Sequence, residues 1–301
     1  MTSTMPELEG VTHRYVDAEG LTVHVAVAKP ADPADDVHPP VALVHGWPQH
    51  WWCWHHVMLP LAQDRTVVAV DLRGHGWTDA PASGYDKMTL ADDLYATIIA
   101  LGLGKVDLVG HDWGGWTSLL LAQHHPEVVN RVVSLAIPAP WSGVPLRNVP
   151  PFVYMPLAAG PWGPWLHRSG GQALIRAIYR MGTSRKGRLS AAELEIYLER
   201  YRQPDRARAG ALFYRTFLTQ EVRPLLRGTY SPGAPKQPIL MLAGTRDPVS
   251  TPAYVKSAIE PGSDITFAVV KGSGHFIPEE QPDVVLEHVR RFLSEASPVR
   301  D

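Results

Sequence analysis

Residues 105–115, KVDLVGHDWGG, are the stretch that decides the fold. An apolar run, VDLV, comes first, and a segment with Leu119, Leu120 and Ala122 at helical spacing follows. Between them, Gly110-His111-Asp112-Trp113-Gly114 has the form Gly-x-nucleophile-x-Gly, in which small residues let the chain turn sharply from strand to helix. The exposed side chain would be the carboxylate of Asp112, which the N-terminal N–H groups of the helix favour in its ionised form. The alternative is a surface turn with Asp112 as a helix N-cap.

A loop that could complete such a site follows an earlier apolar run. It is His45-Gly46-Trp47-Pro48, at the place where an oxyanion-hole loop is required. The backbone N–H groups of Trp47 and Trp113 would then converge on one oxyanion. We also expect the side chains of Trp47 and Trp113 to line the substrate pocket, and the neighbouring tryptophans to lie mostly in the core.

Two further candidates lie near the end of the chain. Asp247, in GTRDPVS, and His275, in GSGHFIP, each follow a late apolar run. Nucleophile, acid and histidine then occur in the chain order of a strand–turn–helix hydrolase. Each residue alone could be structural, but together they predict a catalytic triad of Asp112, Asp247 and His275.

The order of apolar runs indicates an α/β fold. Val11 to Ala28 suggests two short strands around a turn at Glu19-Gly20, and Thr89 to Leu101 suggests a helix with Thr89 as its N-cap. Continuous apolar runs between them suit parallel strands covered on both faces. The runs are residues 39–48, 65–74, 105–115 and 131–138, and then 237–245 and 265–274.

The segment between the two groups of runs has a different pattern. It opens with a Pro- and Trp-rich stretch, continues with helical segments near 171–181, 190–202 and 205–219, and shows no strand period. Ser190 and Glu193 make a capping box for the second of these helices. We therefore expect a core domain of residues 1–140 and 230–301, with residues 141–229 inserted as a helical cap.

Composition limits the possible functions. With 301 residues and a formal net charge of −2, the chain offers no electrostatic footprint for nucleic acid or anionic membrane. It has one cysteine, Cys53, and it shows neither a signal-peptide pattern at its start nor a run of about 20 apolar residues. We therefore expect a cytoplasmic protein. The histidine pairs His55-His56 and His124-His125 lack metal-ligand spacing, and we expect neither a metal nor another cofactor.

A carboxylate nucleophile restricts the chemistry. Attack on an ester would give an anhydride, whereas attack on an electrophilic sp³ carbon gives an alkyl-enzyme ester that water can hydrolyse. Epoxides and alkyl halides are the main substrates that remain. His275 would then activate the hydrolytic water, with Asp247 fixing its tautomer.

These motifs together resemble those of the epoxide hydrolases of the α/β-hydrolase superfamily. His45-Gly46-Trp47-Pro48 matches HGxP, Arg73-Gly74-His75-Gly76-Trp77-Thr78 matches RGxGxS/T, and residues 110–115 match GHDWGG. The spacing between Asp247 and His275, 275 − 247 = 28, is also typical of the family. The resemblance covers nearly the whole chain. It implies an α/β-hydrolase fold, with a mostly parallel eight-stranded sheet and a helical cap between the sixth and seventh strands.

The same resemblance implies two cap tyrosines that hold the epoxide oxygen. By position these are Tyr154, in PPFVYMPLAAGP, and Tyr214, in ALFYRTF. Both could instead be packing residues, since the cap region holds further tyrosines. The expected reaction turns a small, uncharged, apolar epoxide and water into a vicinal diol, in a monomer or homodimer.

Other enzymes and proteins remain as alternatives. Haloalkane dehalogenases also carry HDWG, so Trp113 does not discriminate, but their oxyanion loop usually has Asn or Glu where this chain has Trp47. Fluoroacetate dehalogenases carry arginine just after the nucleophile, where this chain has Trp113, which counts against an anionic substrate. A catalytically dead ligand receptor would need no complete triad. A serine esterase is excluded by Asp112 at the turn.

Overall fold

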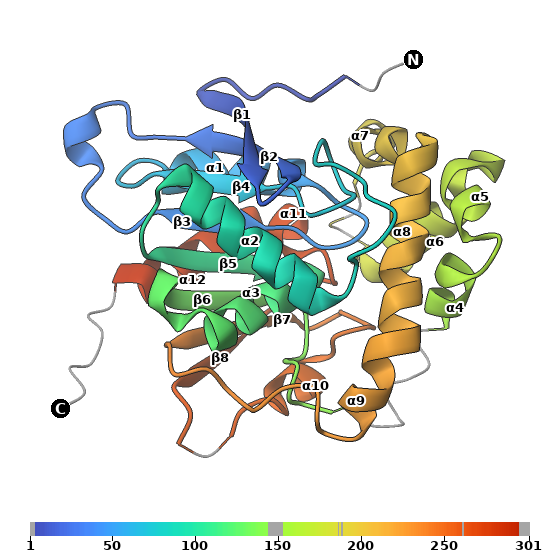
Figure 1. The fold of residues 1–301 in the computed structure, drawn as a ribbon. Helices are drawn as coiled ribbons and strands as arrows, with labels where there is room; N and C mark the ends of the chain where they lie inside the picture. Colours follow the sequence, from blue (N-terminus) through green and yellow to red (C-terminus); the bar gives the residue numbers. More distant parts are fainter. Residues whose placement is uncertain (1–3, 144–152, 186, 188, 261, 295–301) are drawn as a thin grey trace.

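One mixed sheet forms the centre of the structure, a computed structural model that describes residues 4–143, 153–185, 187, 189–260 and 262–294. Within these ranges, eight strands lie in the order β1-β2-β4-β3-β5-β6-β7-β8 (Figure 1). β1 pairs with β2 and β2 with β4 in antiparallel fashion, and the other neighbours are parallel. The expected mostly parallel, eight-stranded sheet is therefore confirmed.

The strands follow the apolar runs of the sequence. They are β1 (Val11–Ala18), β2 (Leu21–Ala28), β3 (Val41–Val44), β4 (Val67–Val70), β5 (Val106–His111), β6 (Val129–Leu135), β7 (Ile239–Gly244) and β8 (Ile265–Val270). Every residue of β3, β4, β5 and β7 is buried, because helices cover both faces of the parallel part of the sheet. The hairpin of β1 and β2 turns at Glu19 and Gly20, as expected, and both have positive φ.

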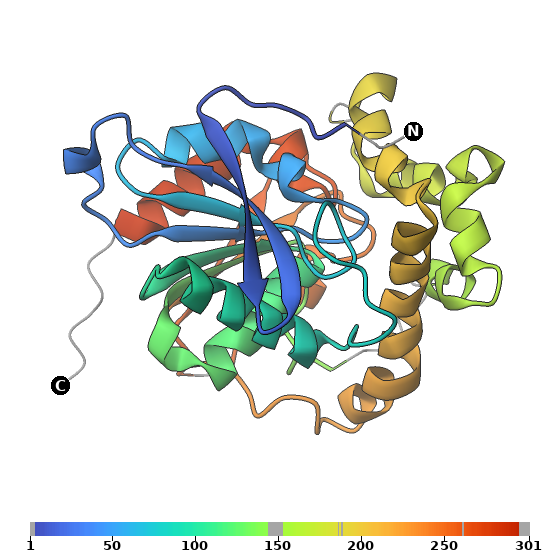
Figure 2. The same ribbon diagram turned by 45° about the horizontal axis from the view of Figure 1, so that its top comes forward.

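Helices pack on both faces of the sheet. Figure 2 shows α1 (His55–Leu61) and α12 (Pro282–Ser294) on one face, and α2 (Lys87–Leu101) and α3 (Trp113–His124) on the other. The expected N-cap of α2 was wrong. Asp86 caps this helix through a hydrogen bond from the Thr89 N–H (2.9 Å), and the Thr89 hydroxyl donates to the same carboxylate (2.7 Å). Asp86 lies one turn earlier, and an ionised carboxylate is a strong cap.

All described elements between β6 and β7 are helical, apart from turns and loops. They are α4 (Tyr154–Ala159), α5 (Gly163–Arg168), α6 (Ala173–Gly182), α7 (Ala191–Tyr201), α8 (Pro204–Thr216) and α9 (Val222–Leu226), with a short 3-10 turn at Gly170–Gln172. Figures 1 and 2 show this group at one end of the sheet. The capping box of Ser190 and Glu193 is confirmed. The domain boundaries at 140/141 and 229/230 stay a prediction; we use "cap" below for the helices α4 to α9.

A buried ion pair attaches the cap to the core near the start of α9. Between α8 and α9 the chain forms a π-helical turn, Phe217–Glu221. Glu221 accepts hydrogen bonds from the backbone N–H and the ammonium of Lys87, at 2.9 and 3.3 Å, and from the Tyr230 hydroxyl. The Lys87 ammonium is fully buried and lies 3.9 Å from the centre of the Phe213 ring. We call this contact the Lys87–Glu221 clamp.

Two arginines attach the opposite end of the cap, where α7 ends and α8 begins. Arg200 of α7 donates to the carbonyl oxygen of Gly76 (2.8 Å from Nε), and its guanidinium lies 4.6 Å from the centre of the Trp77 ring. Arg206 of α8 donates to the carbonyl oxygen of Thr78. These charge-assisted hydrogen bonds join the cap to the loop that follows β4, so the cap is bound to the core at both ends.

The Lys87–Glu221 clamp gives a stability prediction. Lys87→Met or Glu221→Leu alone should lower the free energy of unfolding by about 3–5 kcal/mol, because each leaves the other buried charge unpaired. The double variant should be closer to the parent than the sum of the singles. Chemical denaturation followed by circular dichroism measures all three. Glu195→Gln, which removes part-exposed ion pairs with Arg176 and Arg202, is the control and should change stability by less than about 1 kcal/mol. Additive single effects would contradict the clamp.

Candidate active site

The predicted nucleophile lies at a very tight turn between β5 and α3. A Cβ at Gly110 would lie 2.4 Å from the Gly114 carbonyl oxygen, and one at Gly114 would lie 2.1 Å from the Val44 carbonyl oxygen. Glycine is therefore required at both positions. Asp112 itself has φ 51° and ψ −129°, a sparsely populated conformation for a residue with a side chain. Hydrogen bonds hold it there, including one from its own N–H to the Leu135 carbonyl oxygen (2.9 Å).

The structure brings the three predicted triad residues together. The Nδ1 of His275 lies 2.9 Å from Oδ2 of Asp247, and its Nε2 lies 3.6 Å from Oδ1 of Asp112. The other Asp247 oxygen, Oδ1, accepts the N–H groups of Val249 (2.7 Å) and Ser250 (2.9 Å). All three side chains are buried. One imidazole therefore connects two carboxylates, with the Asp247 carboxylate held by the backbone.

Electrostatics around His275 favour its charged form. Burial alone would lower its pKa, but the carboxylates of Asp247 and Asp112 outweigh burial and raise the pKa of His275 to about 10. The imidazole is then an imidazolium at neutral pH, paired with Asp112. Loss of the Asp112 charge would remove one of the two causes and lower the pKa.

The predicted oxyanion loop reaches the nucleophile. The backbone N–H of Trp47 donates to Oδ2 of Asp112 at 3.1 Å, and Trp113 is the first residue of α3, directly after Asp112. The His45 ring supports the loop, because its Nε2 accepts the Leu72 N–H (3.0 Å) and its Nδ1 donates to the Gly46 carbonyl oxygen (2.8 Å). Burial lowers the pKa of His45, which suits this neutral tautomer.

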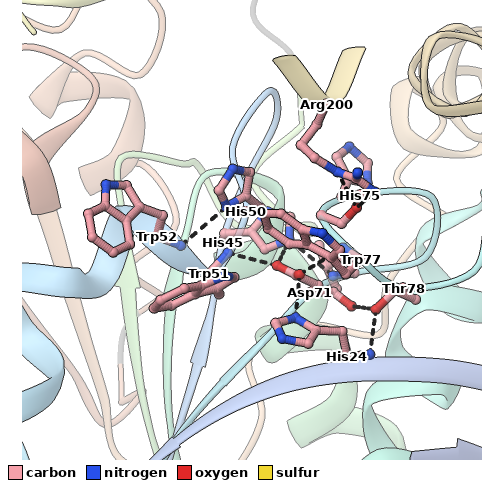
Figure 3. A network of polar contacts seen from close by, with 12 residues as sticks. His24, His45, His50, Trp51, Trp52, Asp71, His75, Trp77, Thr78 and Arg200 are labelled. Carbon is pink, nitrogen blue, oxygen red and sulfur yellow. Dashed lines mark hydrogen bonds and ion pairs between the residues drawn. The ribbon is translucent and has the colours of Figure 1, made fainter. Parts of the chain in front are cut away.

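A third buried carboxylate, Asp71, fixes the far end of the same loop (Figure 3). It accepts the N–H of Trp51 at 2.7 Å, the N–H of Trp77 at 3.0 Å, and the ring of His24 at 2.6 Å. Burial would raise the pKa of Asp71, but the nearby histidines, His24 above all, hold it well below its usual range. The ionised Asp71 thus ties the end of the oxyanion loop to the loop that contacts the cap.

The two predicted cap tyrosines meet above this site. Their hydroxyl oxygens lie 3.1 Å apart, although Tyr154 begins α4 and Tyr214 lies on α8. The ring of Trp47 contacts both, edge-on to Tyr214 (4.9 Å between ring centres) and nearly parallel to Tyr154 (6.1 Å). Burial raises the pKa of both tyrosines, so the hydroxyls stay protonated and can donate.

Two cavities reach Asp112. The larger, about 430 Å³, is mostly apolar, and the smaller is about 10 Å³. Asp112, Tyr154 and Val249 line both cavities. The larger is also lined by Trp113, Trp116, Ile137, Phe217, Val222, Leu225 and Tyr254, among others. Trp113 therefore faces the larger cavity and Trp47 the smaller one, whereas Trp51 and Trp54 are fully buried in the core.

Sequence reasoning missed the residues that hold the His275 loop. Nε2 of His111 donates to the His275 carbonyl oxygen (2.8 Å), and the Gly182 carbonyl oxygen accepts the His275 N–H (2.7 Å). The Glu280 carboxylate accepts the N–H groups of Gly274 (2.9 Å) and Phe276 (3.2 Å). His111 lies inside the GHDWGG motif, which was a usable signal, but nothing in the sequence pairs Gly182 with His275.

Among the residues that the structure describes, no group of three or more His, Cys, Asp or Glu side chains is arranged to hold a metal ion. Likewise, none of the helices that the structure describes is long and apolar enough to cross a bilayer.

Known proteins resemble the whole chain. The soluble epoxide hydrolase of Corynebacterium sp. strain C12 is 27% identical over 94% of this chain and 98% of its own. Human epoxide hydrolase 4 is 27% identical over 96% of this chain and 81% of its own. The solved structure of the epoxide hydrolase CorEH without ligand superposes with a TM-score of 0.77, at 25% identity, over 96% of this chain and all (100%) of the other. Residues 39–282 match the family described as alpha/beta hydrolase fold, and the chain therefore belongs to the α/β-hydrolase fold family.

Proposed function

We propose that this protein is an epoxide hydrolase that opens its substrate through a covalent ester on Asp112. The observation that carries the proposal is the pair of hydroxyls of Tyr154 and Tyr214, 3.1 Å apart, in which Tyr154 lines both of the cavities that Asp112 lines. A halide leaves as a weakly basic anion and needs only N–H donors, whereas an epoxide oxygen leaves as an alkoxide that needs a proton. The relatives named epoxide hydrolases support the same choice.

In the first step, an oxygen of Asp112 attacks one epoxide carbon. The bond from that carbon to the epoxide oxygen breaks, and the oxygen takes its proton from Tyr154 or Tyr214. The product is an ester of Asp112 that carries a free hydroxyl on the neighbouring carbon. The tyrosine hydroxyls act where negative charge develops, so they lower the barrier more than they strengthen substrate binding.

In the second step, His275 takes a proton from water, and the oxygen of that water adds to the ester carbonyl. The Trp47 N–H, which contacts Oδ2 of Asp112, stabilises the oxyanion. Collapse of the intermediate breaks the acyl C–O bond and releases the diol, whose leaving oxygen takes that proton from His275. The second proton of the water, left on the Asp112 carboxyl, then passes to the imidazole and restores the starting ion pair. Asp247 orients the imidazole and stabilises its charge throughout.

The charges explain how His275 becomes a base at the right time. Before the reaction, Asp112 is one of the groups that raise the pKa of His275 to about 10. Forming the ester removes the negative charge of Asp112, so the pKa falls and the imidazolium can pass its proton to the tyrosinate left by ring opening. The covalent step therefore prepares the base for the hydrolytic step.

The covalent ester should be seen directly. Asp112→Ala should abolish alkylation, and His275→Gln should let a substrate-mass adduct accumulate on the peptide that contains Asp112, because only hydrolysis needs the imidazole. Quenched single-turnover reactions with styrene oxide, followed by mass spectrometry, measure both. In H₂¹⁸O, the first turnover should give diol with an unlabelled oxygen from Asp112. An unmodified peptide in His275→Gln would refute the mechanism.

The tyrosine pair separates epoxide opening from dehalogenation. Tyr154→Phe and Tyr214→Phe should each slow alkylation by about 10²–10³-fold, as for oxyanion-donor deletions, and the double variant should be nearly inactive. Tyr85→Phe is the control, because this buried hydroxyl donates to the Pro81 carbonyl oxygen (2.8 Å). Hydrolysis of an ester already formed should change little. If the double variant opened epoxides at the parent rate, the dehalogenase alternative, tested with 1-bromobutane, would take precedence.

The pKa of His275 should depend on the charge of Asp112. Asp112→Asn imitates the neutral ester, so the pKa should fall, as NMR titration of the imidazole would show. Because the folded pKa of about 10 exceeds the unfolded value of about 6.5, the ion pair stabilises the parent fully below pH ~6.5. This contribution should be lost as the pH rises from there towards 10. The loss of stability over this pH range should be smaller in Asp112→Asn. An equal pKa in both proteins would contradict the coupling.

A further inference from the structure

The two cavities that meet at Asp112 differ in what surrounds them. The larger has an apolar wall from α3, α4, the π-helical turn Phe217–Glu221, α9 and residues that follow β6 and β7. The smaller is lined by His275 and, from the cap helix α6, by Ile178, Met181 and Gly182. The described residues that line the larger cavity do not include His275. The candidate base thus faces one space, and most of the apolar wall faces the other.

The size of the smaller cavity, about 10 Å³, suits one water molecule, which needs roughly 10–15 Å³ for its centre. A bound water also needs two or more polar partners. Asp112 and His275 both line this cavity, and Oδ1 of the former lies 3.6 Å from Nε2 of the latter. The separation is too long for a direct hydrogen bond, so both atoms keep bonding capacity for a water beside them.

The smaller cavity also lies close to the molecular surface. Met181, at the end of α6, lines it and is 42% exposed, whereas Ile178, one turn earlier, is 8% exposed. Next to them, Gly182 packs so closely that a Cβ there would lie 2.8 Å from the Phe276 ring. The Met181 side chain is therefore the part of this wall that faces both the solvent and the cavity.

We propose that the smaller cavity binds the hydrolytic water, and that water enters it beside Met181, separately from the organic substrate. The proposal rests on the proposed function. Substrate in the larger cavity would cover the apolar side of the ester and close that route to water. A separate entrance keeps water available to His275 while the alkyl group still fills the larger cavity.

The proposal predicts that the two chemical steps respond to different walls. Ile178→Phe and Met181→Trp add bulk to the wall of the smaller cavity, and Val222→Phe adds bulk to the wall of the larger one. Ala177→Trp, at an exposed position of α6, controls for a large side chain on that helix. Styrene oxide is the probe, and rapid quench with mass spectrometry follows both the formation and the decay of the Asp112 ester.

We expect Ile178→Phe and Met181→Trp to slow decay of the ester by about tenfold or more, which corresponds to about 1.4 kcal/mol, so that the adduct accumulates at steady state. Ester formation should stay within about threefold of the parent, by the same rate arithmetic. Val222→Phe should instead slow ester formation or raise KM, and leave decay unchanged. Ala177→Trp should resemble the parent in both steps.

Three results distinguish the possible failures. Normal decay in Ile178→Phe and Met181→Trp, at parental thermal stability, overturns the water site and leaves the proposed function intact. Equal slowing of both steps would also overturn it. No adduct in His275→Gln would overturn the proposed function as well. If Ile178→Phe does not fold, Met181→Trp against Ala177→Trp decides the question at the surface of α6.

Discussion

The close approach of three backbone segments at Asp112 is the constraint on which the rest of the site depends. Gly114 of α3 packs on the end of β3, where a Cβ would lie 2.1 Å from the Val44 carbonyl oxygen. A Cβ at Gly46 would lie 2.4 Å from the Cβ of Asp112. Strand, oxyanion loop and helix therefore form one packed unit. The Trp47 N–H reaches the nucleophile because Gly46 and Gly114 place only hydrogen atoms between these backbone segments.

Buried carboxylates hold the parts around this unit. Asp71 binds the N–H groups of Trp51 and Trp77, Asp247 binds His275, and Glu221 binds Lys87. Each carboxylate has a cationic or imidazole partner and further N–H or O–H donors, which offset the cost of removing its charge from water. The histidines near Asp71 keep its pKa far below neutrality. The Asp71 carboxylate therefore stays ionised, and keeps its hydrogen bonds to the two loops, over the pH range in which proteins normally work.

Much of the fold could be predicted because its signals are local. Continuous apolar runs gave the parallel strands, Glu19-Gly20 gave the hairpin, and Ser190 with Glu193 gave the start of α7. Local chemistry also misled at α2, where Thr89 and Asp86 are both good caps and the carboxylate is the one used. Helices α4 and α5, of six residues each, are too short to show a period in a Pro- and Trp-rich stretch. The domain boundaries remain untested.

The candidate site was predictable only where a motif marked it. Glycines mark Asp112, and the chain order marks Asp247 and His275, so the sequence pointed to three side chains that the fold brings together. Lys87 and Glu221 are 134 residues apart, and no spacing rule connects them. The division between two cavities depends on side chains from α3, α6 and α9, which meet only after the chain has folded.

The attachment of the cap at both ends affects how molecules enter and leave the enzyme. A lid fixed at one end can swing like a door, over microseconds to milliseconds, but a span fixed by Lys87 at one end and by Arg200 and Arg206 at the other resists such swinging. Molecules then pass between side chains that rotate within picoseconds to nanoseconds. Slender substrates would be admitted faster than broad ones of equal hydrophobicity, so the gaps in the wall act as a sieve for shape.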